Sequence, residues 1–440
     1  MFKRKIETKL YEYYNSDDQR IPIIKGARQI GKSYIIRATA KKYYKNYIEI
    51  DLKSDFEDQK LFLNIKSTKD FYILLSSLCG QKLNTYKDTI VFLDEIQFYP
   101  HLITLFKDLK AEKRFKFIAS GSLLGITLKN IFVPMGSINE ISMFPMDFEE
   151  FLWANNVNEE VTKYLYECFQ SLNQINESIH QRILGLFQDY LIAGGLPAAV
   201  TEYVINKNVK KTREIQEEIF NYYLNDCSQY DIENKLKISN IYSMLLSQMS
   251  NKVKRIQFKK IDNKKNADLS KYSDEFDYLV ASGISLKSKS ISNPTFPLAE
   301  TSSKNLIKFY YNDVGILTNL LYRNNIDALL KKDKGINLGS FYETVVAMEL
   351  NAHGNDLFYF DSRKIGEVDF LVNDYDSLSV IPIEVKSGND QNNFRAIPKL
   401  VDEKMYKLPF GYIFGNKNIV SKEGKLITLP IYMIMFINNN

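Results

Sequence analysis

The sequence is poor in the residues from which many metal and nucleophile sites are built. Its 440 residues include three cysteines and three histidines. The cysteines lie far apart and fit neither a disulfide pairing nor a zinc spacing, so we expect reduced thiols in the core. The histidines are equally scattered, which argues against a histidine metal site and against a Ser-His-Asp hydrolase. The six residues are Cys79, Cys168, Cys227, His101, His180 and His353.

Long apolar runs and a strong charge excess are also missing. The longest late apolar run, Leu429–Ile437, contains a proline and is far shorter than the ~20 residues of a membrane helix. No apolar stretch of a secretory signal follows the basic N-terminus, Met1–Lys5. The net charge of +5 is small for this length, so any nucleic-acid surface must be local. We therefore expect a cytoplasmic protein with two or three domains.

One short stretch, Gly26–Ser33, fits the phosphate-binding pattern G-x-x-x-x-G-K-[ST] at every fixed position. Ile21–Ile24 before it predicts a buried strand, and Tyr34–Tyr44 after it predicts a helix, which is the context this motif requires. The glycines permit a tight bend that points backbone N–H groups inward, and the helix start adds a positive dipole end. The predicted nucleotide-binding residues are Gly26, Ala27, Arg28, Gln29, Ile30, Gly31, Lys32 and Ser33.

A second motif, Thr89–Glu95, is an apolar run that ends in two carboxylates. It predicts a strand buried on both faces of a parallel sheet, with its acidic end at the sheet edge where the phosphate loop lies. Lys32 would then contact the β- and γ-phosphates of ATP, Ser33 and Asp94 would hold Mg²⁺, and Glu95 would activate the attacking water. Taken alone, the first motif could be a chance glycine turn and the second an acidic loop. The presence of both motifs favours ATP binding.

The chain continues with alternating strands and helices. The run Phe115–Ser122 predicts a strand with small polar residues at its tip. A hydroxyl there, of Ser120 or Ser122, could sense the γ-phosphate or position the water, and a satisfied turn serine explains it equally well. Further on, Asp147 with Glu150 three residues later predicts a capping box at a helix start.

The order of these motifs resembles a widespread prokaryotic family of AAA-type ATPases. In that family G-x-R-Q-x-G-K-[ST] is followed by L-D-E-x-Q, [ST]-G-S, P-x-x-F-x-E and G-G-x-P. This sequence carries, in the same order, Gly26–Ser33, Leu93–Gln97, Ser120–Ser122, Pro145–Glu150 and Gly194–Pro197. The resemblance implies an ATP-hydrolysing domain with a parallel sheet and a helical lid. The family often places Gly-Arg where this chain has Gly136-Ser137. The source of a charge-neutralising arginine is therefore open, and so is the existence of an oligomer that could supply it.

The middle of the chain predicts helices with a short hairpin, the pattern of a winged helix. Within it, the window 251–265 holds seven lysine and arginine residues against one aspartate, a net charge of +6 that exceeds the charge of the whole chain. Phosphate contacts from this window would give salt-dependent DNA binding. A solvated lysine-rich loop is at least as good an explanation.

The C-terminal region combines a predicted helix with two strands that carry carboxylates. Glu343 lies near the start of the helix, and Asp369 lies on the first of the two strands. Glu384 and Lys386 are two residues apart on the second strand and so share a face. Carboxylates placed in this way can bind Mg²⁺ or Mn²⁺, while a lysine orients or activates water beside a scissile phosphate.

This pattern resembles the core of PD-(D/E)-x-K nucleases, and the ATPase family above commonly ends in such a domain. The matching motifs here are Glu367–Phe370 and Ile383–Lys386. The resemblance implies that Glu343, Asp369 and Glu384 hold the metal and that Asp369, Glu384 and Lys386 act in catalysis. The opposing explanation is that E-x-K is common on solvated strands.

An α/β protein of three parts is therefore predicted. An AAA-type parallel sheet with a helical lid spans 1–206, a winged-helix-like region spans 207–300, and a mixed α/β restriction-endonuclease-like domain spans 301–440. Two functions stay open, an ATPase with an active nuclease and an ATPase whose C-terminal domain only binds nucleic acid or protein. A third, a non-hydrolysing scaffold, is disfavoured because a pure binder needs no water-activating carboxylate such as Glu95.

Overall fold

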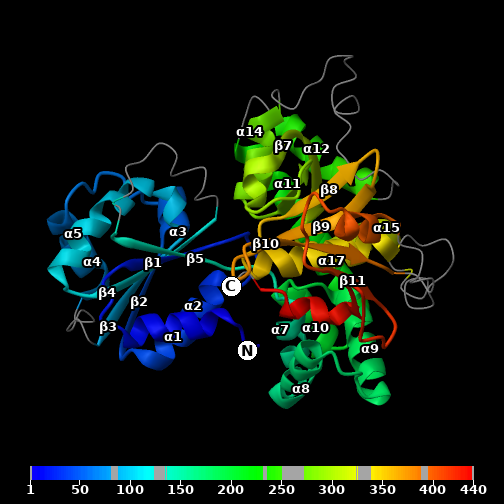
Figure 1. Ribbon diagram of the computed structural model, residues 1–440. Helices are drawn as coiled ribbons and strands as arrows, with labels where there is room; N and C mark the ends of the chain where they lie inside the picture. Colours follow the sequence, from blue (N-terminus) through cyan, green and yellow to red (C-terminus); the bar gives the residue numbers. More distant parts are fainter. Residues whose placement is uncertain are drawn as a thin grey trace. The chain divides into compact units, whose positions relative to one another are not determined.

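The computed structural model describes residues 2–80, 88–122, 134, 136–230, 235–249, 272–323, 325, 338–387 and 395–438. The chain divides into two compact units, one formed mainly by Lys3–Phe144 and the other by Pro145–Val280 with Ile284–Asn440 (Figure 1). The basic window 251–265, predicted to contact DNA, lies outside the described residues. The three-part division at residues 206 and 300 stays a prediction.

The first unit is built on a five-stranded sheet in the order β2-β3-β4-β1-β5, and all its neighbouring strands run parallel. The predicted strands before and at the phosphate and acidic motifs are confirmed as β1 and β3. The strands are β1 (Ile21–Lys25), β2 (Asn46–Asp51), β3 (Thr89–Asp94), β4 (Lys116–Gly121) and β5 (Ile138–Ser142). Because every strand points the same way, their carboxyl ends meet at one edge of the sheet.

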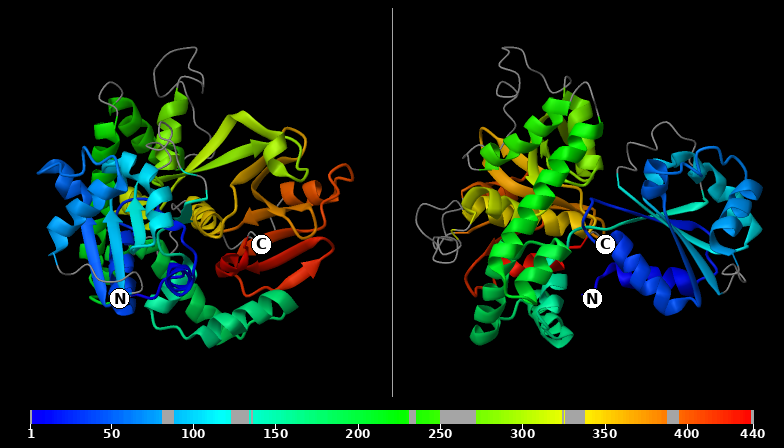
Figure 2. Two further views of the ribbon diagram at one scale, coloured as in Figure 1. Left: turned by 90° about the vertical axis from the view of Figure 1, so that its left-hand side faces the viewer. Right: turned by 180° about the vertical axis from the view of Figure 1, so that it is seen from behind.

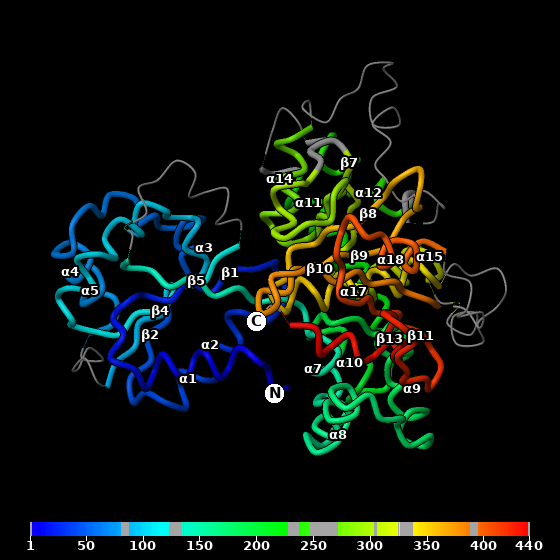
Figure 3. The backbone as a smooth tube through the Cα atoms, in the orientation of Figure 1, coloured from blue at the N-terminus to red at the C-terminus, as the bar shows by residue number. Residues whose placement is uncertain are grey.

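Helices cover both faces of this sheet (Figure 2). Alternate strand residues such as Ile23, Val91 and Ala119 pack in one apolar core against α3, α4 and α5. On the other side α1 and α2 lie side by side (Figure 3), joined by a 3.1 Å hydrogen bond between the Tyr14 and Thr39 hydroxyls. Burial on both faces explains why β3 reads as an unbroken apolar run. The helical segments are α1 (Ile6–Asn15), α2 (Lys32–Tyr43), α3 (Leu52–Glu57), α4 (Thr68–Cys79), η2 (Ile96–Phe98), η3 (Pro100–Leu105) and α5 (Phe106–Glu112).

The second unit begins with a run of helices. The capping box predicted at its start is confirmed, because Asp147 Oδ1 accepts from the Glu150 N–H at 2.9 Å and Glu150 Oε2 accepts from the Asp147 N–H at 3.3 Å. The helices are α7 (Phe148–Ala154), α8 (Glu159–Ser171), α9 (Glu177–Ala193), α10 (Pro197–Val204), α11 (Val209–Tyr230), α12 (Lys235–Met249) and α14 (Ser273–Ala281). Among the helices that the structure describes, none combines the length and hydrophobicity needed to span a bilayer.

An eight-stranded mixed sheet follows in the second unit, in the order β12-β13-β11-β10-β9-β8-β6-β7. Its strands are β6 (Ser285–Ile291), β7 (Ser302–Tyr311), β8 (Phe358–Ser362), β9 (Gly366–Asp374), β10 (Ser379–Val385), β11 (Gly411–Gly415), β12 (Ser421–Glu423) and β13 (Leu426–Pro430). The accompanying helical segments are η6 (Leu298–Thr301), α15 (Val314–Tyr322), α17 (Leu338–Ala352), α18 (Ala396–Asp402) and η7 (Ile431–Phe436). β9 and β10 are antiparallel neighbours. The mixed α/β character of this region is confirmed.

A close approach of backbone segments explains the Gly194-Gly195 pair. Asp313, fully buried, accepts from the Gly195 N–H at 2.6 Å and from the Ile316 N–H at 3.0 Å, where it caps α15. Burial raises the pKa of Asp313 to about 6, and its backbone hydrogen bonds oppose that rise. A Cβ on Gly195 would lie 2.2 Å from the Met146 carbonyl oxygen. The motif is therefore required by packing within this unit.

We expect Gly195→Ala to lower the free energy of unfolding by roughly 1–3 kcal/mol or more, because the added methyl group forces the backbone apart. Gly185 in α9 is a matched control, since a Cβ added there would have no heavy atom within 4 Å. Gly185→Ala should be stabilising by about 0.5–1 kcal/mol. Urea unfolding of both variants measures the difference, and similar effects at the two positions would contradict the packing account.

Candidate functional site

The loop between β1 and α2 depends on backbone conformations that favour glycine. Gly26 has a φ of 153° and Gly31, the N-cap of α2, has a φ of 92°. A Cβ on Gly26 would lie 2.2 Å from the Met143 carbonyl oxygen, so no larger residue fits there. Gln29 also adopts a positive φ, of 65°. This curvature matches the phosphate-cradling loop that the motif predicts.

Two buried side chains hold the loop in place. Ile30 is fully buried, which anchors the middle of the loop. The buried Arg4 guanidinium donates to the Ile30 carbonyl at 3.2 Å and to the Phe144 carbonyl at 2.7 Å. The loop is therefore fastened by a residue well separated from it in sequence.

Lys32 lies inside the loop. Its Nζ donates to the carbonyl oxygens of Ala27 at 2.7 Å and Gly26 at 3.1 Å. Burial lowers the pKa of Lys32 to about 8, although the nearby carboxylates of Glu95 and Asp94 oppose this shift. The amine is thus held near the loop by groups that an incoming phosphate could replace.

Asp94 joins three chain segments at the carboxyl edge of the sheet. Its Oδ1 accepts from the Ser33 hydroxyl at 2.8 Å and also from the Ser120 hydroxyl. Burial raises the pKa of Asp94, while these two hydroxyl groups oppose the rise. A hydroxyl and a carboxylate in contact are the hard oxygen ligands that Mg²⁺ takes in such sites.

Glu95 follows directly, its N–H donates to the Ser120 hydroxyl at 3.4 Å, and its carboxylate is held by other side chains. It has a φ of 58°, which turns the chain sharply after β3. Its Oε2 accepts from the Gln97 side-chain amide and from the Ser122 hydroxyl at 3.4 Å. The Ser122 oxygen also accepts from Arg28 Nε at 3.1 Å. These contacts orient the carboxylate that the sequence predicts as the water-activating group.

The two candidate serines, Ser120 on β4 and Ser122 just after it, therefore contact different carboxylates. Ser120, fully buried, is hydrogen bonded to Asp94, whereas Ser122 is hydrogen bonded to Glu95. The predicted role of Ser120 near the γ-phosphate stays a prediction. Sequence reasoning missed Gln97 as a residue that positions Glu95, although it is part of the L-D-E-x-Q motif.

In the second unit the predicted carboxylates lie on adjoining strands. Asp369 Oδ2 accepts from the Val385 N–H at 2.8 Å, which ties β9 to the end of β10. Glu384 is 7% exposed, and its Oε1 accepts from Lys386 Nζ at 2.6 Å. Burial raises the pKa of Glu384, and Lys386 opposes the rise. Glu343 on α17 acts on the same carboxylate electrostatically, so the structure brings all four predicted residues into one region.

Two further residues of this region were not predicted. Lys308 on β7 is fully buried, and its Nζ donates to Glu367 Oε1 at 2.5 Å. Burial acts to lower the pKa of Lys308, but neighbouring carboxylates, first Glu343 and then Glu367, outweigh it and the pKa is raised. No local spacing links residues 308 and 367, so only the strand order could have revealed this pair.

The predicted C-terminal metal ligands are not gathered closely. Within the described part of the chain, one group of three potential ligand side chains has its ligand atoms within 4.8 Å of one another, and it consists of Asp147, Glu349 and His353. Glu343, Asp369 and Glu384 do not form such a group among the described residues. Metal binding by these three residues stays a prediction.

Comparison with known proteins bears on the first unit. Residues 18–152 match the family described as an AAA domain. This match supports a P-loop AAA-type ATPase. Residues 184–327 and 338–433 match two families described as domains of unknown function, DUF8612 and DUF4143. A search of curated proteins finds no match.

Among solved structures, the chain is similar to the Walker-type ATPase PABY2304 of Pyrococcus abyssi. The sequence identity is 14%, the alignment covers 73% of this chain and 96% of that chain, and the TM-score is 0.44.

The AAA-type domain should bind nucleotide more weakly at high pH. Because burial lowers the pKa of Lys32 to about 8, the amine loses its proton in the free protein as the pH rises through that value, so nucleotide binding increasingly takes up a proton and affinity should fall by up to about tenfold per pH unit. Titration of a fluorescent ATP analogue from about pH 7 to about pH 9.5, in buffers of different ionisation enthalpy, measures both the affinity and the proton uptake. Lys25→Ala, which removes an exposed lysine paired with Glu140, should leave the profile unchanged, and a flat wild-type profile would contradict the assignment.

Proposed function

We propose that this protein binds and hydrolyses ATP at the β1–α2 loop, that it engages DNA, and that its C-terminal sheet carries a metal-dependent nuclease centre. The observation that carries the proposal is the meeting of Ser33, Asp94 and Ser120 beside a glycine loop with Lys32 inside it. DNA would be contacted by the basic window 251–265, within a winged-helix-like region, and by the C-terminal domain. An oligomer that supplies an arginine to the nucleotide is compatible with this proposal.

Each residue of the nucleotide site has a role in ATP hydrolysis. The loop N–H groups and the α2 N-terminus bind the β- and γ-phosphates, and Lys32 leaves the loop carbonyls to contact them. Ser33 and Asp94 would hold Mg²⁺, which supplies charge neutralisation to the phosphates. Glu95 accepts a proton from the attacking water and is held in position by Gln97 and Ser122. The products are ADP and inorganic phosphate.

In the C-terminal sheet, Lys386 is paired with the Glu384 carboxylate. Mg²⁺ or Mn²⁺ held by Asp369, Glu384 and Glu343 would polarise a scissile phosphate. Lys386, which lies beside these ligands through its contact with Glu384, would orient water or stabilise the leaving oxygen with its ammonium group. While Lys386 is paired with Glu384, burial acts to lower the pKa of Lys386, but the Glu384 carboxylate outweighs it and the pKa is raised.

One observation favours a second function for this region. The Asp369 carboxylate accepts a backbone N–H and Glu384 is paired with Lys386. These contacts also suit a domain that binds nucleic acid or a protein without cleaving it. In this alternative the protein is an ATP-driven switch whose C-terminal domain is a binding module.

ATP turnover is tested with two variants of the first site. Lys32→Ala should abolish ATP binding, because the loop loses the ammonium group that would contact the β- and γ-phosphates. Glu95→Gln should keep the affinity and lower the turnover by at least about 100-fold, the low end of general-base contributions. Equilibrium binding and phosphate release measure the two quantities. Unchanged nucleotide affinity in Lys32→Ala would show that the loop is not the site.

Cleavage is tested with plasmid DNA, Mg²⁺ or Mn²⁺, and ATP present or absent. Wild type should nick the plasmid, and Asp369→Asn should not, because the amide oxygen can still accept from Val385 while the charge that binds the metal is lost. Asp374→Asn, at the other end of β9 and hydrogen bonded to Ser377, should cut like wild type. If wild type leaves DNA intact with every metal, the binding-module alternative replaces the nuclease.

A further inference from the structure

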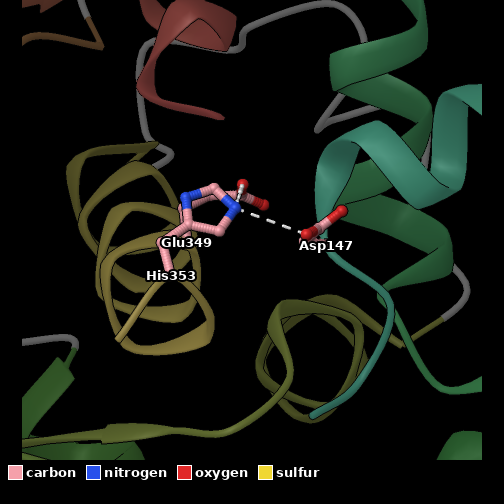
Figure 4. Close-up of side chains that lie close together, drawn as sticks. All are labelled: Asp147, Glu349 and His353. Atoms are coloured by element: carbon pink, nitrogen blue, oxygen red, sulfur yellow. Dashed lines mark hydrogen bonds and ion pairs between the residues drawn. The ribbon is translucent and has the colours of Figure 1, made fainter. Parts of the chain in front are cut away.

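A compact cluster of three side chains lies in the second unit, and it shares no residue with either site above. Asp147 at the N-cap of α7 faces Glu349, which lies in the last turn of α17, and His353, which directly follows that helix (Figure 4). Their side chains are 5%, 0% and 5% exposed. The sequence predictions contain no metal role for any of the three residues.

Each of these side chains is oriented by the backbone through one of its two polar atoms. Asp147 Oδ1 accepts from the Glu150 N–H at 2.9 Å, and Glu349 Oε1 accepts from the Phe148 N–H at 2.7 Å. His353 Nδ1 lies 3.1 Å from the Ile437 carbonyl oxygen. The second polar atom of each side chain, Oδ2, Oε2 and Nε2, is thereby directed toward a common point, as outer hydrogen bonds orient metal ligands.

The proton on His353 can be placed from these contacts. A carbonyl oxygen only accepts, so Nδ1 carries the proton that it donates to Ile437. In a neutral imidazole Nε2 then presents a lone pair, and it faces Asp147 Oδ2 at 3.3 Å and Glu349 Oε2 at 3.8 Å. Carboxylate oxygens also present lone pairs. Three lone pairs that converge in this way suit a cation between them.

The contact between His353 Nε2 and Asp147 Oδ2 at 3.3 Å is a hydrogen bond when Nε2 carries a proton, and it is long for a charged one. A charged N–H to carboxylate hydrogen bond is ordinarily about 2.7–2.9 Å. Two ligands at about 2.1 Å from a tetrahedral metal ion are separated by roughly 3.4 Å. The observed separations of 3.3 and 3.8 Å lie nearer the second value.

We propose that Asp147, Glu349 and His353 form a binding site for a divalent transition metal ion of the zinc class. Two carboxylates balance the charge of such an ion, and the imidazole nitrogen selects it over Mg²⁺, which takes oxygen ligands. The ion would fasten the start of α7 to the C-terminal half of α17. Through the His353 contact to Ile437 it would also fix the end of the described chain. This role is structural and independent of the proposed ATPase and nuclease.

The test is metal binding by the full chain after treatment with a chelator and without nucleotide. Co²⁺ is titrated by its visible absorption, and the melting temperature is measured with and without Zn²⁺. Wild type should bind one equivalent of Co²⁺ with a tetrahedral-type band, and Zn²⁺ should raise its melting temperature. Altering a residue that only orients a metal ligand lowers metal affinity by about 10–100-fold. Asp147→Asn removes a ligand itself, so its Co²⁺ affinity should fall by more than that. Its melting temperature should not respond to Zn²⁺.

Asp147→Asn separates the metal from the fold. Asparagine remains a good N-cap that can accept from Glu150, and its amide can donate to the Nε2 lone pair of a neutral His353. Its unfolding in chelator should therefore match that of wild type. Glu349→Gln, whose amide oxygen can still accept from Phe148, repeats the test if the first variant is unstable.

Two further variants control for other sites. Glu384→Gln alters only the C-terminal sheet cluster, and His180→Asn removes a different buried histidine, which contacts the Tyr432 hydroxyl. Both should keep the Co²⁺ band. Absence of Co²⁺ and Zn²⁺ binding in wild type, or binding of equal strength in Asp147→Asn and Glu349→Gln, would overturn the proposal and leave His353 as a protonated partner of the two carboxylates.

Discussion

The Asp94 carboxylate is the group on which the nucleotide site depends. It is buried, and hydroxyls from two other segments, Ser33 at the start of α2 and Ser120 on β4, stabilise it. These segments meet because β4 lies between β1 and β3 in a sheet whose strands all run parallel. Parallel order brings every carboxyl end to one edge. The glycine loop, the lysine within it and the neighbouring Glu95 then have fixed positions relative to this carboxylate.

Burial raises the pKa of Asp94, Asp313 and Glu384, and the surroundings of these three carboxyl groups oppose the rise by different means. Asp94 receives hydroxyl groups, Asp313 receives backbone N–H groups, and Glu384 receives the ammonium group of Lys386. A hydroxyl or an ammonium group on a side chain can turn away from a carboxylate and contact a metal ion or a phosphate. Backbone N–H groups within a packed turn cannot move in this way. The first and third groups therefore suit ligand sites, and the second suits a structural role.

Local patterns allowed much of the fold to be predicted. These local features depend on residues that are close together in the sequence, where spacing and periodicity carry the information. They are the phosphate loop, the doubly buried β3 strand, the capping box at Asp147 and the β9–β10 hairpin. Contacts set by strand order and helix packing could not be predicted. Lys308 and Glu367 pair across β7 and β9, and Asp147 meets His353 across 206 positions. The scattered histidines argued against a histidine metal site, and the site proposed at His353 departs from that expectation, because its two carboxylates are brought to the histidine by the fold and not by sequence spacing.

The central claim is that Ser33 and Asp94 form the metal side of the nucleotide site. It is tested most directly by comparing ATP affinity with Mg²⁺ and with chelator in wild type and in Ser33→Ala. The account predicts that Mg²⁺ strengthens ATP binding by wild type and that this strengthening is lost in Ser33→Ala, while affinity in chelator is similar for both. An equal effect of Mg²⁺ on the two proteins would contradict it.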